Sequence, residues 1–320
     1  MLSGVPAKAS KLSGYKEKYL RETLEGFERN GFALSREKRD ELKKIKDAIS
    51  ETGNAFNKNI AEYQDHLMVS DEEIDGLPED YKKERKQENG AYKIDLSYPS
   101  YLPFMKYSNS DEARKKLYMK YNNRAAPKNL EVLRDLLQRR KDMVDVLGYR
   151  SYAEWRLEDR MAKEPKTVWD FERELAKSIE AKATFDYNEM LDMKKARFPG
   201  DNATDISPWE SSYISNILLE EKYQLDNEEV KQYFPMDNVL DGLFEITQTI
   251  FNVSYREVED PLVWHQEVRL FEVIDHGKLI GRFYLDLFPR DNKYTHAACF
   301  GMIKGKNTDL GYQVPNATLV

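Results

Sequence analysis

The sequence contains a single cysteine, Cys299, so no disulfide bond can form within the chain and no oxidising compartment is indicated. It also has few glycines (15) and prolines (12) for 320 residues. No apolar run is long enough for a transmembrane helix. The 50 lysines and arginines stand against 57 aspartates and glutamates, a formal net charge of −7. That balance excludes a general positive field for nucleic acid or an anionic membrane, so we expect neither partner.

The remaining composition is typical of a folded chain, with 40% hydrophobic and 33% charged residues. Helical periodicity dominates it. The clearest case begins after Ser35, where apolar residues recur at spacings near three and four. The cluster of Asn54, Asn57 and Asn59 predicts a local interruption of this helix, because asparagine favours caps and turns. Further helices are predicted over residues 15–29, 79–86, 110–121, 130–147, 151–161, 165–197, 208–223, 226–232 and 237–251.

Two segments carry other local signals. The sequence from Ser70 to Glu73 has the capping-box pattern and predicts the start of a short helix. Residues 90–105 alternate between apolar and polar at first and then carry Pro99 and Pro103. We expect a short strand there, followed by a loop.

The last quarter of the chain has a different pattern. Residues 267–274 and 279–287 are rich in apolar side chains and flank His276 and Gly277, which predicts a β-hairpin. Residues 296–303 could add a third strand. The predicted fold is therefore mainly α-helical, with a small β-sheet near the C-terminal end of the chain.

The four histidines make a search for a metal site short. None is followed four residues later by another histidine, so the HExxH pattern of zinc peptidases is absent. His265 and Glu267 with His276 across the hairpin form a conceivable metal site, but surface or hydrogen-bonding histidines are the stronger interpretation. The pair of Cys299 and His296 suggests a thiol nucleophile; a buried, inert thiol is favoured over it.

Several stretches of the sequence nevertheless resemble a known family. Early in the chain these are FERNGFALSREKRDELKKIKDAISETGNAFNKNI, EEIDGLPEDY and RRKDMVDVLGYRSYAEWRLEDRMAKEP. The most specific stretch begins PWESSYISN and continues to FEVIDHGKLIGRFYLDLFPRDNKYTHAACFG. Together they are similar to the thimet oligopeptidase family, which includes neurolysin, saccharolysin, oligopeptidase A and mitochondrial intermediate peptidase.

This resemblance implies a zinc-dependent metalloendopeptidase that hydrolyses short peptides. The family fold it implies is a helical two-domain structure with a central channel and a small sheet beside the zinc. On this basis residues 1–108 are expected to form an N-terminal helical region and residues 109–320 the first part of the catalytic domain. The family's HExxH lies downstream of the stretch similar to THAACFG. We therefore expect no catalytic residue, no metal ligand and no bound zinc in this chain, although the full-length family enzyme carries zinc.

One site assignment follows from the resemblance. The stretch made of His296, Ala297, Ala298, Cys299, Phe300 and Gly301 is similar to the family strand that borders the active-site cleft, and we expect it to contact substrate. The alternative is that it only completes the sheet.

Three functional hypotheses stay open. The first is a partial, catalytically incomplete peptidase. The second is a non-catalytic helical module that binds peptides or a protein, and the third is one half of a split peptidase whose partner is the missing C-terminal half. A cytoplasmic location fits best. The mitochondrial matrix is the alternative, because the first 16 residues are basic and poor in acids, although they lack arginine.

Overall fold

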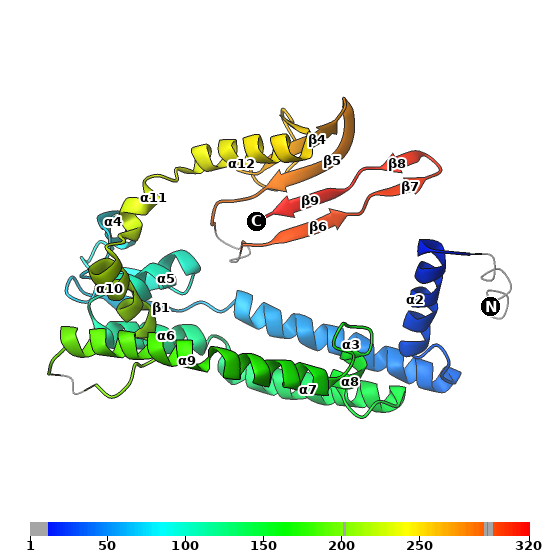
Figure 1. Cartoon of the computed structure of the whole chain (residues 1–320), viewed down its shortest axis with the longest axis horizontal. Coiled ribbons are helices and arrows are strands. Elements are labelled where there is room, and N and C mark those ends of the chain that lie inside the picture. The colour runs from blue at the N-terminus through cyan, green and yellow to red at the C-terminus, as the bar shows by residue number, and fades with distance from the viewer. Residues whose placement is uncertain (1–11, 201–202, 291–292, 294–296) are drawn as a thin grey trace. The chain divides into compact units, whose positions relative to one another are not determined.

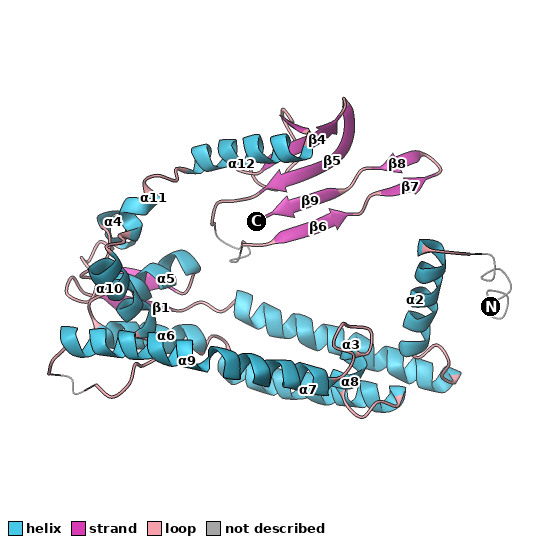
Figure 2. Ribbon diagram, viewed as in Figure 1, coloured by secondary structure: helices cyan, strands magenta, loops and turns pink. Residues whose placement is uncertain are grey.

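A computed structural model describes residues 12–200, 203–290, 293 and 297–320 of the chain. It is mainly helical, with a small mixed sheet near the C-terminal end, as predicted (Figures 1 and 2). Two compact units can be separated, one comprising residues 1–64 and 122–189 and the other residues 65–121 and 190–320. The expected boundary between residues 108 and 109 stays a prediction. No helix in the described ranges combines the length and the apolar character that a membrane span requires.

The first unit is built on two long helices that lie side by side in Figure 1, α3 (Arg36–Ala61) and α7 (Ala126–Leu147). Its other helices are α2 (Tyr15–Arg29), α8 (Tyr152–Leu157) and the first part of α9 (Pro165–Arg197). Leu42, Met143 and Val144 form its buried core.

Local signals set the ends of both long helices. The Ser35 hydroxyl accepts a hydrogen bond from the Lys38 backbone N–H at 3.3 Å and caps α3. Gly148 ends α7 with φ +85°. The predicted interruption of α3 at its asparagines was wrong. Asn59 instead bonds the Asn129 side chain at 2.8 Å, and Asn129 donates to the Phe56 carbonyl at 3.1 Å, so the amides join α3 to α7.

The second unit begins with a helical cluster around a two-stranded sheet. It comprises β1 (His66–Val69), α4 (Glu79–Arg85), β2 (Tyr92–Asp95), α5 (Tyr98–Tyr107) and α6 (Asp111–Asn122). The end of α9 and α10 (Ser211–Tyr223) also belong to this unit. The capping box forms as predicted, with Ser70 and Glu73 bonded reciprocally, but it opens a series of turns and not a helix.

Helix α5 lies where a loop was predicted. Pro99 occupies its first turn, where a backbone N–H has no helical partner, so its missing N–H is tolerated. Pro103, inside the helix, cannot donate to the Pro99 carbonyl. Arg85 donates to that carbonyl instead, from Nη2 at 3.2 Å. A residue from another helix thus satisfies the group that the second proline leaves unpaired.

The sheet follows α11 (Asn227–Lys231) and α12 (Met236–Phe251). It has the order β3-β4-β5-β9-β6, with β3 (Ser254–Glu257), β4 (Arg269–Asp275), β5 (Lys278–Leu285), β6 (Cys299–Ile303) and β9 (Asn316–Leu319). Leu240 and Phe244 of α12 pack on one of its faces, against Phe271 and Leu285. A two-residue turn at His276 and Gly277, both with positive φ, joins β4 to β5 and confirms the predicted hairpin.

The third predicted strand forms as β6, but it does not pair with the hairpin. Strand β9 lies between them, parallel to β5 and antiparallel to β6. A second small hairpin, β7 (Lys306–Thr308) and β8 (Gly311–Gln313), connects β6 to β9 and was not predicted.

Candidate substrate-binding strand

Strand β6 lies at one end of the five-stranded order, so among the described strands it forms an edge of the sheet. All five of its residues are exposed. Of the stretch predicted to contact substrate, Cys299, Phe300 and Gly301 lie in β6, and Ala297 and Ala298 lead into it. His296 lies outside the described residues. The substrate role itself stays a prediction.

The hydrogen-bond pattern decides which backbone groups of β6 face outward. Ala298 and Val320 exchange both backbone hydrogen bonds, at 3.0 and 2.8 Å, so they form a hydrogen-bonded antiparallel pair. Such pairs alternate with pairs whose N–H and C=O groups point away from the neighbouring strand. By this alternation the backbone N–H and C=O of Phe300 point towards β9, whereas those of Cys299 and Gly301 point towards the open edge. An edge of this kind can bind one more extended segment.

The Cys299 side chain is exposed, which corrects the prediction of a buried thiol. The physical reason lies in the position of its strand. Helix α12 packs over β4 and β5, and no described element covers the Cys299 side of β6. Apolar neighbours in sequence suggested burial, but a strand at the edge of a sheet can leave them exposed: Phe300 is 45% and Met302 51% exposed.

Asp286 fixes the chain where it leaves β5. The residue is 3% exposed, and its carboxylate accepts hydrogen bonds from Arg290 at 2.6 and 3.0 Å and from Trp264 Nε1 at 3.0 Å. Lys293 adds an ion pair at 3.2 Å and donates to the Asp286 backbone carbonyl at 2.6 Å. These contacts, led by Arg290, hold the pKa of the Asp286 carboxyl far below its usual range. The Asp286 N–H donates to the Leu319 carbonyl at 2.8 Å, so the same residue joins β5 to β9.

This network of contacts around Asp286 was not predicted. An aspartate followed four residues later by an arginine is a common pair in a chain with 57 acids. The only local signal was the Phe-Pro-Arg-Asp sequence after the strand, which indicates a turn. The partners Trp264 and Leu319 come from distant parts of the sequence.

The metal-ligating side chains that the structure describes do not gather into a zinc site. Among the side chains that the structure describes, no three from His, Cys, Asp and Glu gather closely enough to hold a metal ion. His265 precedes β4 and His276 follows it, so the seven-residue strand separates them by about 20 Å. His265 Nδ1 instead accepts a hydrogen bond from the Glu267 backbone N–H at 3.3 Å, and His276 Nδ1 lies 3.5 Å from Asp275 Oδ1.

The part of the chain that the structure describes is mainly helical and presents an open edge strand on a small sheet. Comparison with known proteins identifies the family to which the chain belongs. The profile of peptidase family M3 matches residues 104–320, well over half of the chain. The chain therefore belongs to peptidase family M3, a family of zinc metallopeptidases.

The names of similar proteins agree with this family assignment. A thimet-like oligopeptidase from Dictyostelium discoideum is 33% identical and covers 98% of this chain, while the chain covers 48% of it. Oligopeptidase A from Escherichia coli K12 is 31% identical, and the match covers 96% of this chain and 48% of that protein. A mitochondrial intermediate peptidase from Vanderwaltozyma polyspora is 33% identical, and the match covers 91% of this chain and 39% of that protein. The chain thus spans about half the length, or less, of the curated relatives it matches.

Proposed function

We propose that this chain is part of a zinc-dependent metalloendopeptidase that hydrolyses short peptides, and that it supplies the helical framework and a substrate-binding strand. The observation that carries the proposal is the open edge of β6, which lies within the part of the chain that matches family M3. An extended peptide would pair with the outward backbone groups of Cys299 and Gly301. Cleavage would be performed by residues outside this sequence.

Catalytic incompleteness is the second part of the proposal. The sequence has no HExxH, and the described residues offer no cluster of metal ligands. The relatives are about twice as long as this chain. We infer that zinc is bound by the full-length enzyme and not by this chain, and that the chain alone does not cut peptides.

The exposed side of α12 supports a requirement for additional polypeptide. Val239, Leu243, Ile246 and Ile250 recur at helical spacing and are 42%, 44%, 59% and 69% exposed. Leaving 100 Å² of apolar surface in water instead of burying it costs about 2.5 kcal/mol of folding free energy. We propose that the remaining part of an M3 peptidase, whether on the same or on a second polypeptide, covers this side.

A second candidate function is a peptide- or protein-binding module without catalysis. The same edge strand favours it, because binding to β6 requires no metal. Its expected sign is a monodisperse, cooperatively melting monomer in solution. A partial or split peptidase is instead expected to associate with itself or to co-purify with a second polypeptide. For the cellular location, we propose the cytoplasm, with the mitochondrial matrix as the alternative.

The test uses the chain alone and the chain joined to a segment that carries HExxH. The 320-residue chain should leave an internally quenched short peptide uncut with or without added zinc. Cleavage by the chain alone that a chelator abolishes would overturn the proposal. The joined enzyme should cut the peptide.

Within that joined enzyme, Cys299→Pro tests the strand. Proline at this position removes one outward N–H and leaves the hydrogen bonds to β9 in place, a position that edge strands tolerate. The value of kcat/KM should fall about fivefold, which corresponds to one hydrogen bond of about 1 kcal/mol. Cys299→Ala is the control and should keep the wild-type value. Equal activity of both variants would exclude β6 as the substrate strand.

A further inference from the structure

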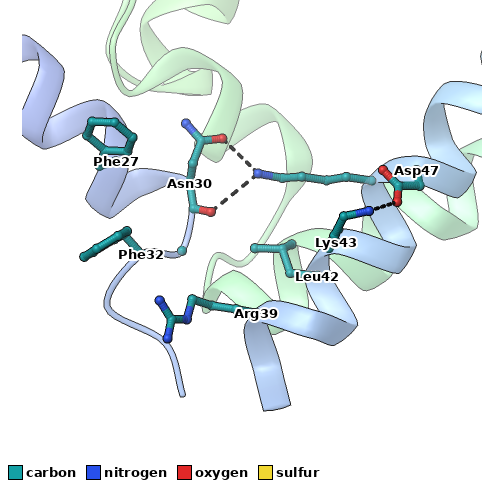
Figure 3. Close-up of a pocket in the computed structure, with 9 residues that line it drawn as sticks. Phe27, Asn30, Phe32, Arg39, Leu42, Lys43 and Asp47 are labelled. Carbon is teal, nitrogen blue, oxygen red and sulfur yellow. Dashed lines mark hydrogen bonds and ion pairs between the residues drawn. The ribbon is translucent and has the colours of Figure 1, made fainter. Parts of the chain in front are cut away.

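A small cavity of about 300 Å³ lies in the first unit, where the end of α2 meets α3 (Figure 3). Gly31 makes the turn between the helices with φ +91°. That turn places the ring of Phe32 against that of Phe27, edge to face, with 6.1 Å between ring centroids. Leu42 is 3% exposed and completes the apolar lining. The full lining is Phe27, Asn30, Gly31, Phe32, Arg39, Leu42, Lys43, Lys46 and Asp47.

Three cations and one carboxylate line the same cavity. Lys43 and Asp47 neutralise each other, with 2.5 Å between Nζ and Oδ2. The Arg39 guanidinium lies 5.7 Å from the Phe32 ring centroid, and Lys46 donates to the Asn30 side-chain oxygen at 3.0 Å. Within the described part of the chain, neither Arg39 nor Lys46 forms an ion pair with a carboxylate. The cavity therefore has two uncompensated positive charges beside two aromatic rings.

Lys46 differs from an ordinary surface lysine. It is half-buried, and burial lowers the pKa of its ammonium group. Its role in the fold is to bind the end of α2 through the Asn30 side chain and, at 3.5 Å, the Asn30 carbonyl. Arg39 makes no such hydrogen bond to α2 among the described residues; its guanidinium lies over the exposed ring of Phe32. Its planar guanidinium can therefore donate two parallel hydrogen bonds to the oxygens of a carboxylate.

We propose that this cavity binds a small carboxylate that carries an apolar group, of the kind presented by the free C-terminus of a peptide with an aromatic or branched last residue. Arg39 and Lys46 would bind the carboxylate, while Phe27, Phe32 and Leu42 would contact the apolar group. The volume is at the lower end for small-molecule sites and fits one such residue. The lining lies entirely within residues 27–47 and includes no residue of β6, so the site does not depend on the proposed peptidase function.

The test is titration of the 320-residue chain with N-acetyl-L-phenylalanine, followed by calorimetry and by ligand-observed NMR. The uncharged N-acetyl-L-phenylalaninamide is the matched probe and should bind at least about tenfold more weakly, because it lacks the charge-assisted hydrogen bonds. Arg39→Gln and Lys46→Met should each weaken binding of the acid about tenfold. Lys44→Gln removes a lysine of the same helix that does not line the cavity and should leave affinity unchanged.

The pH dependence gives an independent readout. A bound anion favours the charged form of Lys46, so the affinity should fall as the pH rises through the pKa of that lysine. In Lys46→Met this dependence should disappear. Equal binding of the acid and the amide, no binding at millimolar concentration, or equal loss in Lys44→Gln would each overturn the proposal. Because these are binding measurements at α2 and α3, a negative result would leave the peptidase proposal intact, and the reverse also holds.

Discussion

The guanidinium of Arg114 stacks on the ring of Tyr213, with 4.0 Å between Arg114 Cζ and the ring centroid. Arg114 is 2% exposed and also donates to Asp111 at 2.8 Å. The Tyr213 hydroxyl donates to the Asn109 side chain at 2.8 Å. This pair joins α6 to α10, about a hundred residues later in the chain, and so connects the two sequence segments of the second unit.

A double-mutant cycle should measure this contact. Arg114→Met and Tyr213→Leu should show a coupling free energy of about 2 kcal/mol, because a desolvated cation–π contact is stronger than an exposed one. Urea unfolding of the wild type, both single variants and the double variant gives the value. The control pair is Arg173 and Trp169, an exposed cation–π contact on α9 at 5.7 Å, whose coupling should be at most about 0.5 kcal/mol. Equal coupling at both pairs would contradict the importance of burial.

Replacement of Asp286 should destabilise the sheet. Asp286→Asn leaves Arg290 and Lys293 without their carboxylate partner, at an expected cost of about 3 kcal/mol in the free energy of unfolding. A lower urea midpoint is the measurement. Asp275→Asn is the control, because that carboxylate is exposed beside the hairpin turn and its loss should change the midpoint little.

The effect of Asp286 should depend on pH in a defined direction. Its pKa is lowered in the folded state, so its carboxylate stabilises the fold fully at pH values above the unfolded pKa of about 3.9. As the pH falls below that value, the unfolded chain takes up a proton first and the stabilisation declines. The difference in unfolding free energy between wild type and Asp286→Asn should therefore be constant above about pH 5 and should shrink towards pH 2. A difference that grows on acidification would contradict this.

Two glycine replacements should have opposite effects. Gly31 has φ +91°, and an added Cβ would lie 2.7 Å from Leu42 Cδ2 and 3.0 Å from Leu34 Cδ1. Gly31→Ala should lower stability by more than about 1 kcal/mol. Gly26 lies inside α2 with nothing within 4 Å of an added Cβ, so Gly26→Ala should raise stability by up to about 1 kcal/mol. Thermal unfolding of the two variants checks both directions.

The Cys299 thiol should react in the folded chain. Because its side chain is exposed on β6, a water-soluble disulfide reagent should modify it without denaturant, at a rate within about tenfold of that in the unfolded chain. Absorbance of the released thiolate follows the reaction. A thiol that reacts only after urea is added would show that β6 is covered in solution, by a second copy or by another polypeptide.

Much of the fold could be predicted from the sequence because its signals are local. The apolar spacing after Ser35, the stop at Gly148 and the turn at His276 and Gly277 depend on neighbouring residues only, and all three are confirmed. The family resemblance is confirmed by the match to M3 over residues 104–320. The stretch expected to contact substrate was identified by that resemblance, and the structure places three of its residues, Cys299, Phe300 and Gly301, on an edge strand.

The sequence by itself determined the mainly helical character, the hairpin and the family, because periodicity, caps and turn residues act within a few positions of one another. Tertiary structure alone decided that α5 continues through Pro103, since the Arg85 side chain donates to the orphaned Pro99 carbonyl. It also decided that β9 separates β6 from the hairpin, and that Cys299 is exposed. Each of these outcomes depends on a partner distant in sequence, and the residues involved carry no local sign of which partner they will meet.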